Sequence, residues 1–64
     1  MTSHIDETGM LKREGGGFAL VRDAGGRYRL ELGRTPVDHV EKRVRVAGRL
    51  IGEGIVEVDG LAPA

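Results

Sequence analysis

Two stretches near the end of the chain alternate strictly between apolar and polar residues. They read RVRVAGRLI over residues 43–51 and IVEVD over residues 55–59, and the turn Gly52-Glu53-Gly54 separates them. Alternation with a period of two places every second side chain on the same face of a strand. The pattern therefore predicts a β-hairpin with one buried face and one exposed face.

The same alternation, less regular, continues through the first half of the chain. Strands are predicted over residues 9–14, 18–22 and 27–32. The segments between them, Gly15–Gly17 and Asp23–Gly26, supply the backbone conformations that tight turns need. Side chains on the shared inner face form the predicted core, which consists of Leu11, Phe18, Leu20, Tyr28, Leu30, Leu32, Val37, Val40, Val44, Val46, Leu50, Val56 and Val58.

Residues 33–41 (GRTPVDHVE) interrupt the alternation and predict one short helix between the third and fourth strands. Thr35 suits the N-cap, Pro36 suits the first helical position, and Asp38 stands three residues after the cap. Three strands, a short helix and two strands follow one another in an OB-fold. We therefore expect an all-β protein, a small five-stranded OB-like barrel, with an SH3-like barrel as the alternative.

The uneven distribution of charge along the chain bears on the order of the strands. Residues 27–52 have seven basic and three acidic side chains, a net charge of +4, whereas residues 53–64 have a net charge of −3. In the OB order the fifth strand lies between the third and the fourth. Its carboxylates, Glu57 and Asp59, would then separate two arginine-bearing strands that would repel each other in a simple meander. The charge pattern favours the OB order.

Length and composition narrow the class of protein further. The 64 residues predict a single domain, residues 1–64, with a small core and marginal stability. The absence of cysteine excludes a disulfide and a Cys-based zinc site. The chain has 10 basic and 10 acidic residues, so it lacks the basic excess of a dedicated nucleic-acid-binding protein. Without an apolar run of membrane-spanning length or a signal-peptide pattern, we expect a cytoplasmic protein.

Six short segments together suggest a family. They are GML at 9–11, GGFAL at 16–20, RYRL at 27–30, PVDHV at 36–40, VRVAG at 44–48 and VEV at 56–58. In these segments the chain resembles an uncharacterised family, of unknown function, of very short alphaproteobacterial proteins. The resemblance covers nearly the whole chain and implies an OB-like fold and a bacterial cytoplasm, but it brings no known active site.

Candidate catalytic and metal chemistry is sparse. His4, Asp38, His39 and Glu41 are the possible metal ligands. Because Asp38 and His39 are adjacent, they diverge around a helix, so we expect no metal site and no cofactor. Gly15–Gly17 precedes a strand and not a helix, so it predicts a hairpin turn and not a phosphate-binding loop. No hydroxyl has an evident histidine base, so we expect no catalytic residues and no enzyme activity.

The sequence leaves two functional hypotheses. The first is a non-enzymatic binding or interaction module whose partner is another protein or a second copy of this chain. Apolar residues on the outward register would form its contact surface, and these are Ala19, Val21, Ala47, Ile51 and Ile55.

The second hypothesis is OB-type binding of single-stranded nucleic acid through outward arginines. The candidate residues are Arg27, Arg29, Arg43, Arg45 and Arg49. Two features weigh against it. Both aromatic residues, Phe18 and Tyr28, fall on the inward register, and Glu57 and Asp59 share the face of the arginines and would repel phosphate. The first hypothesis is therefore preferred.

Overall fold

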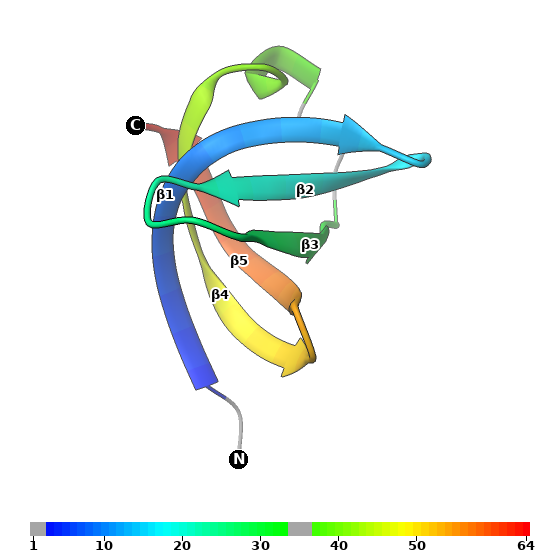
Figure 1. The fold of residues 1–64 in the computed structure, drawn as a ribbon, viewed down its shortest axis with the longest axis vertical. Helices are drawn as coiled ribbons and strands as arrows, with labels where there is room; N and C mark the ends of the chain where they lie inside the picture. Colours follow the sequence, from blue (N-terminus) through cyan, green and yellow to red (C-terminus); the bar gives the residue numbers. More distant parts are fainter. Residues whose placement is uncertain (1–2, 34–36) are drawn as a thin grey trace.

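The strands of the computed structural model follow the predicted order, and residues 3–33 and 37–64 are described. The five strands are β1 (Ser3–Glu14), β2 (Gly17–Arg22), β3 (Arg27–Glu31), β4 (Arg43–Gly52) and β5 (Ile55–Pro63) (Figure 1). Two of them are longer than predicted. β1 begins at Ser3 and not at Gly9, and β5 continues past Asp59 to Pro63.

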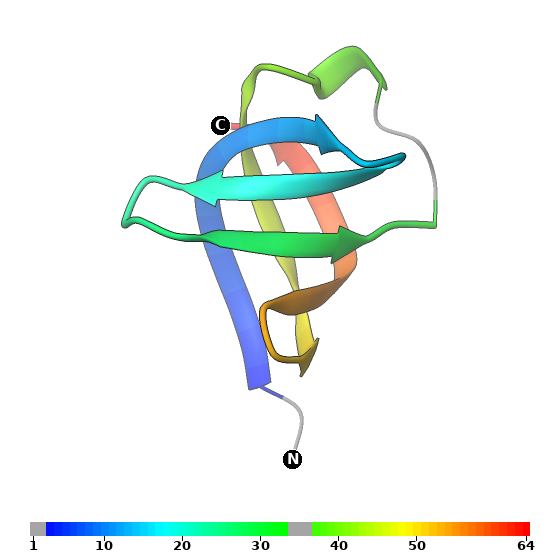
Figure 2. The same ribbon diagram turned by 45° about the vertical axis from the view of Figure 1, so that its right-hand side comes forward.

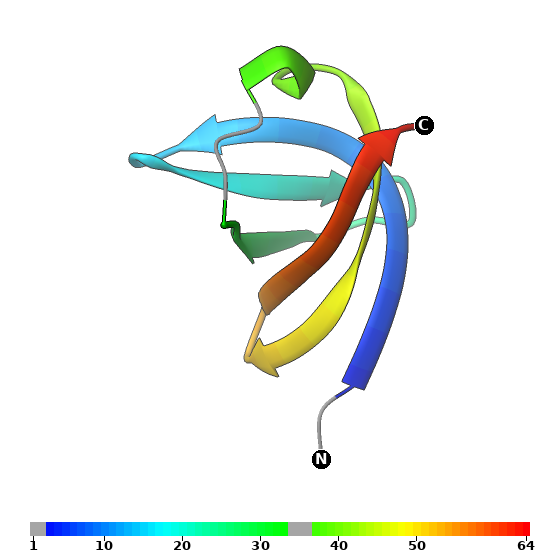
Figure 3. The ribbon, with the colours of Figure 1, turned by 180° about the vertical axis from the view of Figure 1, so that it is seen from behind.

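All five strands belong to one sheet that closes on itself. The hydrogen-bonded order is β1-β2-β3-β5-β4, and β4 pairs in turn with β1. β3 and β5 are parallel, and every other pair is antiparallel. Figures 2 and 3 show the ring of strands from two further sides. β5 therefore lies between β3 and β4, which is the order that the charge pattern predicted.

The closure of the sheet depends on the length and curvature of β1. Residues 3–10 of β1 pair with β4, while residues 9–14 pair with β2, so Gly9 belongs to both pairings. A Cβ on Gly9 would lie 2.8 Å from the carbonyl carbon of Val21 and 2.9 Å from Cα of Arg22. Glycine is needed here because the neighbouring backbone occupies the space of a side chain.

The core consists of the inward side chains of all five strands. Six predicted core residues are buried, namely Leu11, Leu20, Leu30, Val44, Val46 and Val56. Six more are partly buried against them, namely Phe18, Tyr28, Leu32, Val40, Leu50 and Val58. The side chain of Val37 lies outside the described residues. Ile5 and Leu61 also pack against the core, and they were not predicted because the first and last strands were expected to be shorter.

The predicted short helix before β4 is not formed. Only a single 3-10 turn, Val37–His39, is present, and the expected capping residues Thr35 and Pro36 lie outside the described residues. Glu41 has a left-handed φ of 67°, and its N–H donates to the carbonyl of Leu11 at 2.8 Å. After one turn the backbone at residues 41 and 42 instead forms hydrogen bonds with Leu11 of β1, because these bonds satisfy backbone groups on both segments. Tertiary hydrogen bonding outweighs the local helix signals.

Candidate binding surface

The outward arginines of the second hypothesis are mostly engaged by carboxylates of the same chain. Arg27 pairs with Glu14, Arg43 with Asp23, Arg45 with Asp6, and Arg49 with Glu57. The carboxylate partners lie on β1, on β5 and in the turn after β2. An arginine already bound to a carboxylate offers less charge to a phosphate backbone than a free one. Four of the five candidate arginines are therefore poorly suited to follow a nucleic-acid strand.

The carboxylates of β5 were expected to lie between arginines of β3 and β4, and the structure bears this out on the β4 side only. Arg49 and Glu57 are direct neighbours across β4 and β5, as predicted from the alternation. On its other side, however, Glu57 lies opposite Glu31 of β3. Two of the four paired arginines of β3 and β4 find their carboxylates on β1, where Glu14 pairs with Arg27 and Asp6 pairs with Arg45. Sequence reasoning missed this because the predicted first strand began at residue 9 and left Asp6 outside the sheet.

The best-formed of these ion pairs joins β4 to β1. Arg45 donates from Nε to Oδ1 of Asp6 at 2.8 Å and from Nη2 to Oδ2 at 2.5 Å. This two-pronged geometry is the strongest form of an arginine–carboxylate contact. The hydrogen bond from Arg45 lowers the pKa of the Asp6 carboxyl below its ordinary value, and the same bond raises the pKa of Arg45.

Replacing Arg45 by glutamine is expected to return the pKa of Asp6 toward its ordinary value. The folded-state pKa is depressed, so the pair stabilises the fold at neutral pH and loses this effect as the pH falls through the lowered pKa. The stability difference between wild type and R45Q should therefore shrink below about pH 4. An NMR titration of the Asp6 carboxyl carbon measures the shift. R49Q is the matched control, and an equal change of the Asp6 pKa in R49Q would contradict the assignment.

Arg29 is the exception among the five arginines. Within residues 3–33 and 37–64 it forms no ion pair, and the residues outside that range (Met1, Thr2, Arg34, Thr35 and Pro36) include no carboxylate side chain. Arg29 is exposed on β3, and its guanidinium lies over Gly17, where a Cβ would stand 3.3 Å from Nη2. Its positive charge is available to a ligand.

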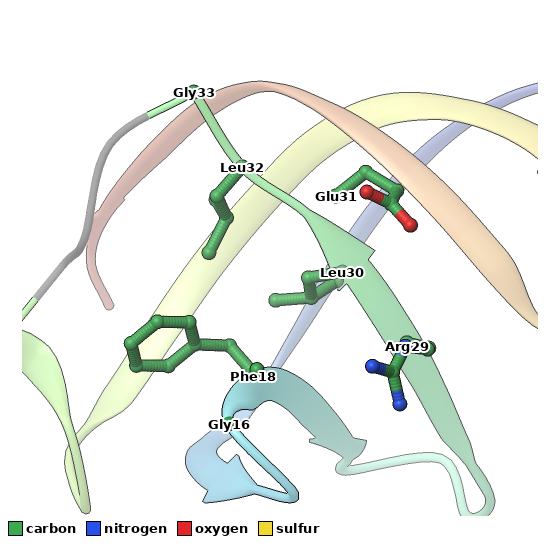
Figure 4. Close-up of a pocket in the computed structure, with 8 residues that line it drawn as sticks. Gly16, Phe18, Arg29, Leu30, Glu31, Leu32 and Gly33 are labelled. Atoms are coloured by element: carbon green, nitrogen blue, oxygen red, sulfur yellow. The ribbon is translucent and has the colours of Figure 1, made fainter.

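Arg29 borders a pocket of about 350 Å³ at one end of β2 and β3. Residues 16–18 and 29–33 line it. The pairing of β2 with β3 ends at Phe18 and Leu30, so the two backbones part beyond that point. Figure 4 shows Phe18 and Leu32 pointing toward one another on one side, while Arg29 and Glu31 extend from the other side of β3. The pocket wall is thus mostly polar, with two opposite charges, the ends of two strands and a small apolar part.

A cluster of polar side chains around Arg22 lies on the inner face of the sheet and was not predicted. Nη1 of Arg22 donates to Glu7 at 3.4 Å and to the hydroxyl of Tyr28 at 3.2 Å, and its guanidinium stands 4.4 Å from the centre of the tyrosine ring. The side chains of Arg22 and Glu7 are only 27% and 31% exposed. The alternation along the chain could have revealed this cluster. Arg22 follows the inward-facing Leu20 by two residues, and Glu7 follows the inward-facing Ile5 by two residues, so both fall on the inner face.

The apolar residues proposed as a contact surface do not gather on one face. Val21 lies on β2, whereas Ala47 and Ile51 lie on β4 and Ile55 begins β5. Ile51 is 49% exposed, but Ala19 is only 4% exposed because it lies between Lys12 and Arg29 on the neighbouring strands. β2 pairs with neither β4 nor β5. Ile51 and Ile55 flank the turn between β4 and β5, but Ala19 and Val21 lie on a strand that adjoins neither, so the five residues do not form one continuous patch.

The remaining candidates for chemistry are also dispersed. His4 is on β1, whereas Asp38 and His39 belong to the 3-10 turn and Glu41 forms an ion pair with Lys12. Across the part of the chain that the structure describes, no three His, Cys, Asp or Glu side chains come together as metal ligands. Within the same residues, no helix has the length and apolar character required to cross a membrane.

The fold and surface define a small all-β protein with five strands in one closed sheet and a pocket bordered by Arg29, which has no ion-pair partner among the described residues. Residues 8–64 match the family described as Protein of unknown function (DUF5818), so the chain belongs to that family. This confirms the expected membership of a family of unknown function. No curated protein and no solved structure matches the chain.

Proposed function

We propose that the protein is a non-enzymatic binding module built on an OB-type barrel, and that its pocket binds an extended segment of a partner polypeptide. The strand order supports the OB-type relation, because β5 lies between β3 and β4 and a bent β1 pairs with both β2 and β4. OB-type barrels bind many kinds of ligand, so the choice of ligand rests on the pocket and not on the fold.

The observation that supports a polypeptide is the mixed character of the pocket wall. Arg29 offers a cation, and Glu31 offers an anion next to Glu57 in the register. Phe18 and Leu32 add a small apolar area to this mostly polar wall. The parting ends of β2 and β3 add backbone groups that a peptide can pair with. A phosphate backbone would be repelled by the carboxylates of Glu31 and Glu57, and Arg27 on the same strand as Arg29 already pairs with Glu14. The mixed wall therefore suits a peptide with both charged and apolar side chains.

Selection from a displayed library of random peptides tests this function. We expect peptides with an acidic and an apolar side chain to be enriched, and their addition to labelled protein should shift the amide resonances of residues 16–18 and 29–33. Arg29→Ala should weaken the binding about tenfold, because a charged hydrogen bond to the ligand is lost. Arg27→Ala is the matched control on the same strand, and it should bind as wild type does, since Arg27 pairs with Glu14.

A titration with labelled single-stranded DNA and RNA distinguishes peptide binding from the alternative function, which is the binding of single-stranded nucleic acid. Binding with a steep dependence on salt, lost when Arg27, Arg29, Arg43 and Arg45 are replaced together, would favour the nucleic-acid hypothesis. Peptide-induced shifts confined to another face would also contradict the pocket assignment. The expected absence of enzyme activity and the cytoplasmic location stay predictions.

A further inference from the structure

Among the residues that the structure describes, the first half of β1 has one edge without a strand partner. Residues 3–10 pair with β4 on one side, but pairing with β2 on the other side begins only at Gly9. Figures 1 and 3 show the N-terminal half of β1 at the rim of the molecule with no strand beyond it. An unpaired edge of this kind is a template for pairing with another strand.

The hydrogen bonds of β1 identify which residues face this edge. The N–H and C=O of Leu11 bond toward the β4 side, to Lys42 and Glu41, whereas the C=O of Thr8 accepts from Asp23 on the β2 side. Successive residues of a strand point their backbone groups to opposite edges. Even-numbered residues therefore face away from β4. Within the described residues, the N–H and C=O groups of His4 and Asp6 point outward without a backbone partner.

We propose that two copies of this chain associate through the edges of β1, by antiparallel pairing of His4 in one copy with Asp6 in the other. A two-fold axis at Ile5 gives two such pairs, in which the outward N–H and C=O groups of His4 and Asp6 in the two copies form four hydrogen bonds. This inference is independent of the pocket, which residues 16–18 and 29–33 line, and does not rest on the proposed function.

The side chains favour this register over its neighbours. His4 and Asp6 are exposed and alternate with the core-packed Ile5, so both stand on the outer face. Each imidazole would lie beside the Asp6 carboxylate of the other copy, which Arg45 of that copy also contacts. If the second copy of β1 is shifted by two residues in one direction along the first, His4 of one copy lies opposite His4 of the other. A shift in the other direction places Asp6 opposite Asp6 and requires Thr8, whose C=O already accepts from Asp23. Of these three registers, only the one centred on Ile5 pairs His4 with Asp6, and it uses the outward N–H and C=O of both residues.

The centre of the proposed interface is apolar. Ile5 is partly buried against the core and would meet its own counterpart across the axis, in a pair without hydrogen bonds of its own. Such pairs bring side chains closest together in an antiparallel ladder. A chain of 64 residues has a small core, so additional apolar burial in a dimer is favourable for it.

Sedimentation of the full chain over a range of concentrations tests the association, and hydrogen exchange tests the interface. We expect a dimer of the 6.9 kDa chain at high concentration, with exchange of the His4 and Asp6 amides slowing as the dimer forms. His4→Pro removes an outward N–H and leaves the ladder with β4 intact, so it should weaken the dimer at least about tenfold. His4→Ala keeps the N–H and should weaken it less.

A disulfide reports the register directly, because the chain has no cysteine of its own. Ile5→Cys should cross-link to itself, since the Cα atoms of a pair without hydrogen bonds lie about 4.5 Å apart, within disulfide range. Glu53→Cys, in the turn between β4 and β5, is the control and should cross-link far more slowly. A monomer at millimolar concentration, or a dimer whose His4 and Asp6 amides exchange freely, would overturn the proposal.

Discussion

Replacing Gly48 by alanine is expected to destabilise the protein by about 3 kcal/mol, because the added methyl group has no space. Gly48 lies on β4 opposite Val58 of β5, next to a register shift between Ala47 and Gly48. A Cβ there would overlap the carbonyl oxygen of Glu57 and stand 3.0 Å from both the carbonyl carbon of Glu57 and Cα of Val58. Backbone atoms cannot turn aside as a flexible side chain can, so the two strands must separate.

The consequence of G48A is large relative to the total stability. A domain of this size has a free energy of unfolding of about 3–10 kcal/mol, so a loss of about 3 kcal/mol removes about a third of it or more and should lower the urea midpoint markedly. Urea denaturation followed by circular dichroism measures it. Gly60→Ala is the matched control, since Gly60 lies on β5 opposite Ala47 and a Cβ there meets nothing within 4 Å. If G48A were as stable as G60A, the close approach of β4 and β5 would not constrain residue 48.

Leu20→Ala is the second substitution for which we expect a large effect, a loss of about 2–5 kcal/mol. Leu20 is fully buried on β2, between Leu11 of β1 and Tyr28 of β3 in the register. Removing the Cγ methine and the two Cδ methyl groups of its side chain leaves a cavity that a closed ring of strands cannot collapse to fill. The loss adds the transfer free energy of those carbons to the cost of the cavity.

Thermal unfolding and urea denaturation of L20A provide the measurement. Ile51→Ala removes similar apolar carbons from a side chain that is 49% exposed, and it should change stability by less than about 0.5 kcal/mol. Equal losses for L20A and I51A would mean that burial in the ring does not determine the contribution of these residues. A melting temperature that depends on protein concentration would independently support association through β1.

The ion pairs on the surface contribute less to the free energy of unfolding than the buried side chains do. They link strands far apart in sequence, as Arg45 links β4 to Asp6 of β1. Exposed pairs of this kind each contribute little to stability, because water screens both charges. Their clearer consequence is functional. They engage four of the five candidate arginines, so that Arg29 alone of the five has no ion pair among the described residues, and the proposed peptide site at one end of β2 and β3 depends on it.

Much of the fold was accessible from the sequence because strand alternation is a local signal. The positions of Leu20, Val44, Val46 and Val56 on the inner face follow from side-chain parity alone. The glycine turns fixed where strands end. The true extent of β1 was less accessible, because residues 3–8 contain polar side chains and show their strand character only when β4 lies alongside. The failed helix prediction has a similar cause, since Leu11 supplies partners that no local rule includes.

By itself the sequence determined the class of fold, the inward register and the absence of cysteine, since each depends only on residue type and on a period of two along the chain. The tertiary structure alone decided which charges meet. Asp6 and Arg45, like Glu14 and Arg27, are distant in sequence, and only closure of the sheet brings them together. It also left Arg29 unpaired and the edge of β1 open, because pairing and exposure are properties of the assembled ring and not of any one segment.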